Sequence, residues 1–115
     1  MKATSATVGI PVTDLAAARR WYERAFELGA PDLEPVEGVA EYKMDGWWLQ
    51  LMAVEQGGGP WILRFEVPDT ATERARLVGL GLEIGEVIRV EGLIDYCEFT
   101  DPDGNQLSLY TEQTG

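Results

Sequence analysis

The 115-residue sequence contains no histidine and only one cysteine, and both scarcities restrict its chemistry. Without imidazole nitrogens, the histidine-containing sites that usually hold Zn²⁺, Ni²⁺ or Fe²⁺ are excluded. Cys97 has no second cysteine with which to form an internal disulfide. A lone cysteine of this kind is most often a small buried apolar side chain, and we expect this of Cys97.

Basic residues are also few, with 9 Lys and Arg against 20 Asp and Glu and a net charge of −11. This balance argues against nucleic acid or an anionic membrane as partner, because both require a basic surface. It favours a neutral or cationic ligand. Apolar runs of membrane-spanning length are absent, and Met1 to Val8 carries no basic-then-apolar signal. We therefore expect a cytoplasmic protein.

What is present is a globular composition, with 45% hydrophobic residues. This length and composition predict a single domain over residues 1–115, built from two small halves. The only stretch that resembles a linker is Gln56-Gly57-Gly58-Gly59-Pro60, near the middle of the chain. We place module one at about 1–56, the glycine-rich linker at 57–60 and module two at about 61–115.

The first half begins with period-two alternation over Ala6 to Val12, which predicts a strand. Apolar residues from Leu15 to Phe26 recur at helical spacing, with Thr13 and Asp14 as caps and Gly29 as the stop. Three extended pieces are expected next. They cover residues 32–36, 39–44 and 47–54, and Asp45-Gly46 is a strong hairpin signal between the last two.

The second half repeats this order. A strand is expected at 61–67, followed by a helix whose apolar face carries Ala71, Ala75, Val78 and Leu80. Asp69 and Thr70 are its expected caps, and Thr70 with Glu73 forms a capping box. Strands at about 86–90, 94–99 and 105–111 complete the half, with the tight turn Asp101-Pro102-Asp103-Gly104 between the last two. The offset between the halves is about 55 residues, which indicates a duplicated unit.

Four segments together resemble the vicinal oxygen chelate superfamily, the glyoxalase/bleomycin-resistance/dioxygenase proteins. They are Val8-Gly9-Ile10-Pro11-Val12-Thr13-Asp14-Leu15, Arg20-Trp21-Tyr22-Glu23, Phe65-Glu66-Val67-Pro68-Asp69 and Asp101-Pro102-Asp103-Gly104-Asn105. The resemblance implies an α+β fold of two βαβββ modules, whose curled mixed sheets form a cleft with the helices outside. It also implies a homodimer.

Enzymes of this superfamily hold a divalent metal with His, Gln or Glu from four strands. The resemblance places these four positions at Thr7, Gln50, Ile62 and Ser108. Only Gln50 is a plausible ligand, because Ile62 has no donor atom and neutral hydroxyls bind such metals poorly. We therefore expect no metal, no cofactor and no catalytic residue.

Alternation along the strands also predicts which side chains face the cleft. On each strand, one set of alternate residues is apolar and should pack against the helices. The other set mixes aromatic and polar side chains, as small-molecule sites do. The predicted ligand-binding residues are Thr7, Trp48, Gln50, Met52, Arg64, Glu66, Tyr96, Glu98, Ser108 and Tyr110.

These residues predict a metal-free protein that sequesters or senses an aromatic or cationic compound, as bleomycin-resistance-like relatives do. Aromatic rings would stack on Trp48, Tyr96 or Tyr110, and Glu66 or Glu98 would pair with a positive group. One alternative is a metal-dependent lyase, isomerase or dioxygenase with a non-standard ligand set that includes Gln50, Glu66 or Glu98. Another is an interacting subunit whose cleft is filled by its own side chains.

Overall fold

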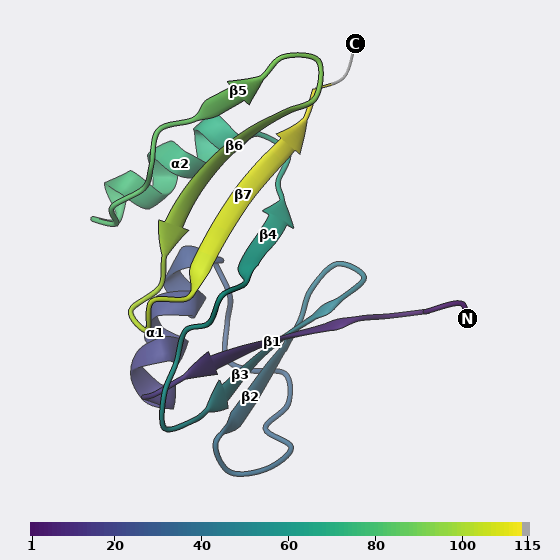
Figure 1. Ribbon diagram of the computed structural model, residues 1–115. Coiled ribbons are helices and arrows are strands. Elements are labelled where there is room, and N and C mark those ends of the chain that lie inside the picture. The colour runs from purple at the N-terminus through teal and green to yellow at the C-terminus, as the bar shows by residue number, and fades with distance from the viewer. Residues whose placement is uncertain (114–115) are drawn as a thin grey trace. The chain divides into compact units, whose positions relative to one another are not determined.

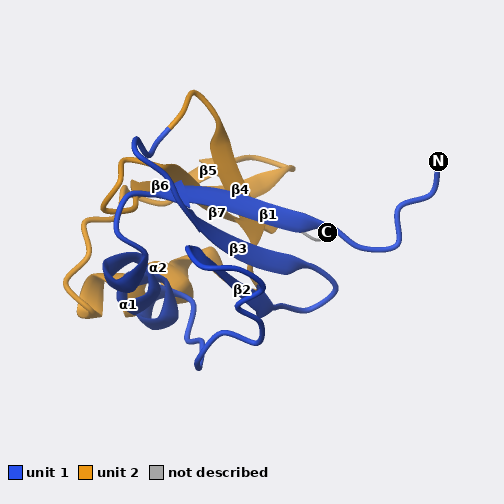
Figure 2. Ribbon diagram, turned by 90° about the horizontal axis from the view of Figure 1, so that it is seen from below, with its two compact units in different colours: residues 1–58 blue, residues 59–115 orange. Residues whose placement is uncertain are grey.

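The computed structural model describes residues 1–113 and contains two compact units, residues 1–58 and 59–115 (Figures 1 and 2). Each unit has one helix and one mixed sheet, so the protein is of the α+β class. Neither helix in the described residues is long and apolar enough to cross a membrane.

The first unit contains β1 (Thr7–Val12), α1 (Leu15–Ala25), β2 (Val39–Lys43) and β3 (Trp48–Ala53). Its sheet has the order β1-β3-β2, with β1 parallel and β2 antiparallel to β3. Helix α1 packs against β3 and β2. The residues buried between them are Ile10, Val12, Ala18, Tyr22, Ala25, Ala40, Tyr42, Leu49 and Leu51. On β1 and β3, these are the alternate apolar residues that the sequence predicts on the helix side of the sheet.

Tyr42 carries a polar group into this core and satisfies it. Its hydroxyl donates a 2.6 Å hydrogen bond to Glu23 on α1, which also pairs with Arg19. Burial of the phenol and this hydrogen bond raise the pKa of Tyr42 above its ordinary value of 10.0. The bond therefore joins the helix to the sheet with a neutral donor.

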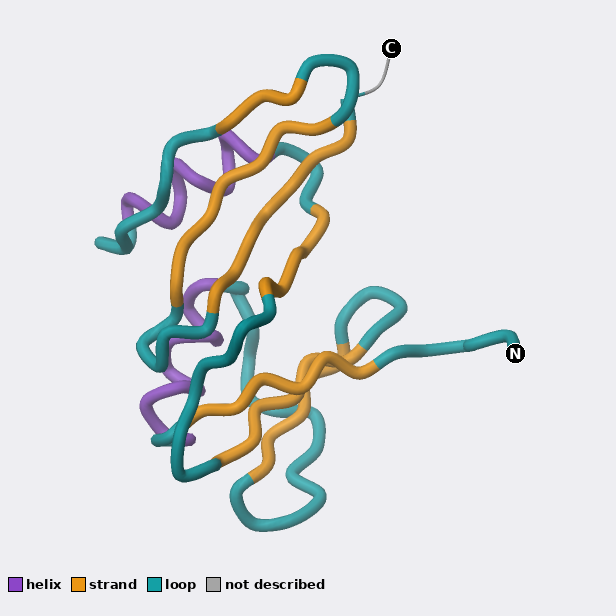
Figure 3. Tube along the Cα trace, viewed as in Figure 1, coloured by secondary structure: helices purple, strands orange, loops and turns teal. Residues whose placement is uncertain are grey.

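The second unit contains β4 (Ile62–Glu66), α2 (Thr70–Gly79), β5 (Ile88–Val90), β6 (Ile94–Thr100) and β7 (Gln106–Glu112). The sheet order is β4-β7-β6-β5, with β4 parallel to β7 and the other pairs antiparallel. Strands β6 and β7 are the longest, and Figure 3 shows both curving along their length.

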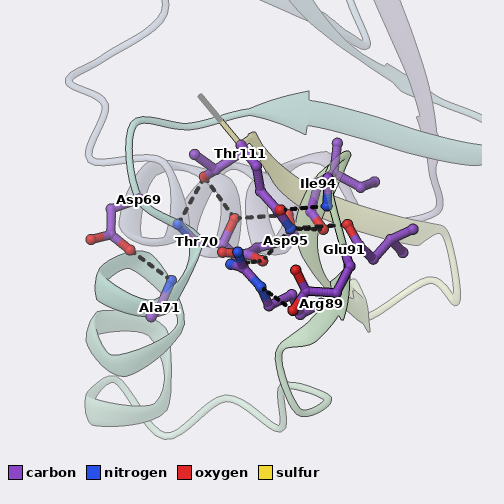
Figure 4. A network of polar contacts seen from close by, with 11 residues as sticks. Asp69, Thr70, Ala71, Arg89, Glu91, Ile94, Asp95 and Thr111 are labelled. Atoms are coloured by element: carbon purple, nitrogen blue, oxygen red, sulfur yellow. Dashed lines mark hydrogen bonds and ion pairs between the residues drawn. The ribbon is translucent and has the colours of Figure 1, made fainter. Parts of the chain in front are cut away.

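A threonine pair fixes α2 to one face of this sheet (Figure 4). Thr111 on β7 accepts a hydrogen bond from the Thr70 backbone N–H at 2.9 Å, and the two hydroxyl oxygens lie 2.8 Å apart. Thr111 also donates to the Val67 carbonyl at 2.9 Å. Because side chains alternate along a strand, α2 covers the face of β7 that carries Leu107, Leu109 and Thr111. The face that carries Ser108 and Tyr110 is therefore the one opposite the helix.

The predicted turn between β6 and β7 is confirmed. Asp101 Oδ1 accepts hydrogen bonds from the backbone N–H groups of Asp103 and Asn105, and its Oδ2 accepts one from the Asn105 side chain. Gly104 has a φ of 82°, which glycine adopts without steric cost. These contacts fix the register between β6 and β7 at the end of the hairpin.

The two units confirm the predicted duplication. β1, α1, β2 and β3 correspond to β4, α2, β6 and β7, and the two sheets share their strand order. The counterpart of β5 in the first unit is reduced, because the predicted strand over 32–36 is only an isolated bridge between Leu33 and Glu41. Likewise β5 is shorter than predicted, since it begins at Ile88 rather than at Glu86.

Three details of the helices differ from the predictions. Helix α1 ends at Ala25, and the residue with positive φ is Glu27 (55°), not Gly29. The N-cap of α2 is Asp69 alone, which accepts hydrogen bonds from the backbone N–H groups of Ala71 and Thr72.

The predicted capping box and apolar face of α2 are wrong as well. Glu73 pairs with Arg76 instead of capping. The buried residues of α2 are Thr70 and Leu77, whereas Ala71, Ala75 and Val78 are exposed.

Candidate functional site

The face of the second sheet opposite α2 brings together six of the predicted ligand-binding residues. The strand register places them in two neighbouring rows across β4, β7 and β6. One row is Arg64, Ser108 and Glu98, and the other is Glu66, Tyr110 and Tyr96. Neighbouring strands lie about 4.8 Å apart, so side chains within a row are direct neighbours.

This face is hollowed beside the tyrosine pair. A cavity of about 480 Å³ is lined by Arg64, Ile94, Tyr96 and Tyr110. Tyr96 and Tyr110 are directly opposite each other on β6 and β7. The volume lies within the usual range for small-molecule sites, and the lining combines two aromatic rings, an aliphatic side chain and one cation.

A second hollow of about 320 Å³ lies farther along the same two strands, lined by Glu98, Phe99, Thr100 and Gln106. Along β7, Tyr110 lines the first cavity and Gln106 lines the second. Ser108 lies halfway between these residues, so it separates the two cavities along the strand.

The charged groups of this face are unpaired. Among residues 1–113, the side chains of Arg64, Glu66 and Glu98 form no ion pair or hydrogen bond, and all three residues are exposed. Their charges are therefore available to a ligand.

Ser108 is the unusual member of this face, because it is fully buried, with 0% exposure. Its Oγ has no hydrogen-bond partner among the described residues. A buried hydroxyl without a partner loses its hydrogen bonds to water and gains none in return. Such a group is a candidate for a hydrogen bond to a bound molecule.

The other four predicted residues lie in the first unit, on the face of its sheet opposite α1. Thr7 is exposed at the start of β1 and pairs in register with Trp48 on β3. Gln50 and Met52 are half-buried on β3.

Gln50 is already engaged within this unit. Its Nε2 donates a 2.6 Å hydrogen bond to Glu41 on β2. Gly9 makes room for the neighbouring side chains, because a Cβ there would lie 3.2 Å from Met52 Cε and 3.3 Å from Gln50 Oε1. The alternation therefore places these residues on one face. The prediction did not include Glu41, the residue to which Gln50 is hydrogen-bonded.

Cys97 lies on the α2 side of the second sheet and takes no part in this site. It is fully buried, as expected, and burial raises the pKa of its thiol.

Comparison with known proteins agrees with this architecture. A sequence model described as the Glyoxalase/Bleomycin resistance protein/Dioxygenase superfamily matches residues 4–109. The chain belongs to this superfamily. A search of curated protein sequences finds no match.

Three solved structures illustrate the similarity of this superfamily member to others. A glyoxalase/bleomycin resistance protein from Catenulispora acidiphila is 20% identical, with a TM-score of 0.78 over 93% of this chain and 96% of that chain. The fosfomycin resistance protein FosX from Listeria monocytogenes is 19% identical, with a TM-score of 0.79 over 98% and 96%. The antibiotic binding protein TnmS3 from a Streptomyces species is 20% identical, with a TM-score of 0.78 over 93% and 93%. At these identities the likeness shows the fold.

The residues of this superfamily member do not fit the divalent metal that the enzymes of the fold hold. Of the four carried-over positions, Ile62 offers only hydrocarbon, while Thr7 and Ser108 offer neutral hydroxyls. The fourth, Gln50, offers its amide oxygen, since its amide nitrogen donates to Glu41, but one such ligand does not make a metal site. In the described part of the chain, no three His, Cys, Asp or Glu side chains are grouped so that they could hold a metal ion.

Five residues of these surfaces were not predicted as ligand-binding residues. Ile94 lines the larger cavity, and Phe99, Thr100 and Gln106 line the smaller one. Alternation along β7 places Gln106 on the same face as Ser108, so the pattern already predicts that it faces the cleft. Glu41 has the same parity on β2, but no sequence signal shows that it pairs with Gln50.

Proposed function

We propose that this protein is a metal-free small-molecule-binding protein that sequesters or senses an aromatic or cationic compound on the open face of its second sheet. The observation that carries this proposal is the 480 Å³ cavity lined by Arg64, Ile94, Tyr96 and Tyr110. Its two tyrosines offer ring faces to a planar or cationic group, and Ile94 adds apolar contact.

Three further observations support the proposal. Glu66 and Glu98 flank the tyrosine pair and are unpaired among residues 1–113, so they can attract a positive group. The net charge of −11 favours the approach of a cation. The fold is also that of a protein described as antibiotic binding, which is the kind of role proposed here.

Isothermal titration calorimetry tests this proposal directly. The panel contains planar aromatic compounds of each charge and a cationic glycopeptide antibiotic. We expect binding by at least one of them, and a loss of about tenfold or more in affinity when Tyr96→Leu and Tyr110→Leu are combined. Val78→Ala, an exposed residue of α2 on the opposite side of the sheet, is the matched control. No binding, or binding that the tyrosine variant leaves unchanged, overturns the proposal.

The proposal includes a cytoplasmic homodimer. Strand β5 is at the edge of the second sheet, and Ile88, Val90 and Leu93 on and beside it are exposed. Unpaired strand edges with apolar side chains are suited to contacts between chains. Sedimentation equilibrium should give twice the monomer mass, and a monomer at high concentration would contradict this part of the proposal.

The alternative is an enzyme with a non-standard metal-ligand set that includes Gln50, Glu66 or Glu98. Metal analysis of protein purified without a chelator distinguishes the two functions. Stoichiometric, tightly bound metal would favour the enzyme.

A further inference from the structure

The row Arg64–Ser108–Glu98 places opposite charges at the two ends of the candidate site. Arg64 on β4 lines the larger cavity, and Glu98 on β6 lines the smaller one. Both pair in register with Ser108 on β7, which lies between them. Their Cα atoms are therefore two strand spacings apart, or about 9.6 Å.

The lack of an ion pair at Arg64 sets it apart from the other arginines of its unit. Arg74, Arg76 and Arg89 each form an ion pair with a carboxylate. Arg64 forms none among residues 1–113, although Glu66 and Glu98 are on the same face. The arginine end and the glutamate end of the row are therefore both open to partners from outside the chain.

Ser108 adds a polar group between these charges. Its Oγ is fully buried and has no hydrogen-bond partner in the described part of the chain. The serine lies on the face opposite α2, at the midpoint of the row. A polar atom of a bound molecule at this point would satisfy a hydroxyl that the protein leaves unsatisfied.

From this arrangement we infer that the site selects amphoteric planar compounds. These carry an anionic group for Arg64, an aromatic ring beside Tyr96 and Tyr110, and a cationic group for Glu98. The inference rests on the proposed function and names its ligand class. The ligand lies across Ser108, whose buried hydroxyl forms one hydrogen bond with it once the side chains that cover the serine move aside.

The charges of the protein favour a compound that carries both an anionic and a cationic group over a compound that carries only one of them. A purely anionic aromatic compound is repelled by the net charge of −11. A purely cationic compound would displace water from around Arg64 without giving this arginine an anionic partner, which costs free energy. An amphoteric compound has no net charge to repel and satisfies both ends of the row.

Calorimetry with four matched compounds tests the inference: 4-(aminomethyl)benzoate, benzoate, benzylamine and 4-methylbenzyl alcohol. We expect the amphoteric compound to bind about tenfold more tightly than either singly charged one. Arg64→Gln should abolish its advantage over benzylamine, and Glu98→Gln should abolish its advantage over benzoate. Arg20→Gln, an exposed arginine of α1, is the control and should change neither ratio.

The outcomes separate this inference from the proposed function. If the four compounds bind equally, or if the two variants leave the ratios unchanged, the charge selection is refuted while binding itself stands. If none of these compounds binds but another aromatic compound binds through Tyr96 and Tyr110, the ligand class is wrong and the function survives. If nothing aromatic binds, both fail. Circular dichroism of each variant checks that it is folded.

Discussion

Ser108 gives the sharpest test of the site, because its hydroxyl should reduce stability in the free protein and support binding in the complex. The Oγ atom is fully buried, and no described residue forms a hydrogen bond with it. Ser108→Ala removes this one oxygen and leaves the backbone of β7 unchanged.

The expected size of the effect follows from the desolvation of that hydroxyl. An unsatisfied buried polar group costs about 1–3 kcal/mol, and the small void left by the oxygen offsets part of the gain. We therefore expect Ser108→Ala to raise the free energy of unfolding by about 1 kcal/mol. For a chain of this length, that corresponds to a rise in Tm of about 4 °C.

Urea unfolding followed by circular dichroism measures the change. The chain has only one other serine, Ser5, which is exposed, so Ser5→Ala is a matched control expected to stay within about 0.5 kcal/mol of the wild type. The affinity of Ser108→Ala for 4-(aminomethyl)benzoate should fall several-fold. A variant that is less stable than the wild type, or equally stable with unchanged affinity, would refute the reasoning.

Two further predictions concern the framework. Gly85→Ala should destabilise the protein by about 1–3 kcal/mol, because the new Cβ would lie 3.0 Å from the Glu98 carbonyl oxygen. The control Gly79→Ala has nothing within 4 Å and should be neutral or stabilising; equal urea midpoints for the two variants would contradict this. Tyr42 has a pKa raised above 10.0 in the folded state, so the unfolded chain releases this proton first and stability should fall as pH rises above about 10. Tyr42→Phe should remove that part of the fall while lowering stability at neutral pH by about 1 kcal/mol, and an unchanged pH slope would refute the assignment.

The fold could be predicted because the signals that determine it are local. Period-two alternation places Ile10, Val12, Leu49 and Leu51 on the helix side of the first sheet. The Asp101 turn is encoded within five residues. The face of α2 could not be predicted in this way, because it buries the polar Thr70, whose hydroxyl lies 2.8 Å from that of Thr111, 41 positions away. Such a contact leaves no mark in the spacing of α2 itself.

For the site, the sequence predicts only which face of each strand carries the candidate residues. Alternation places Arg64, Ser108 and Glu98 on one side of the second sheet, and the register shows that they form one row. Whether each charge finds a partner depends on side-chain geometry. The sequence could not show that Gln50 binds Glu41, or that Ser108 is buried without a partner.

The most direct test of metal-free binding by the second sheet is the affinity of the chelator-treated protein for 4-(aminomethyl)benzoate, measured by calorimetry alongside its metal content. The same Kd before and after treatment, with far less than one metal ion per chain, is the expected result. Loss of binding on chelation and its recovery on adding Zn²⁺, Ni²⁺, Mn²⁺ or Fe²⁺ would contradict the account.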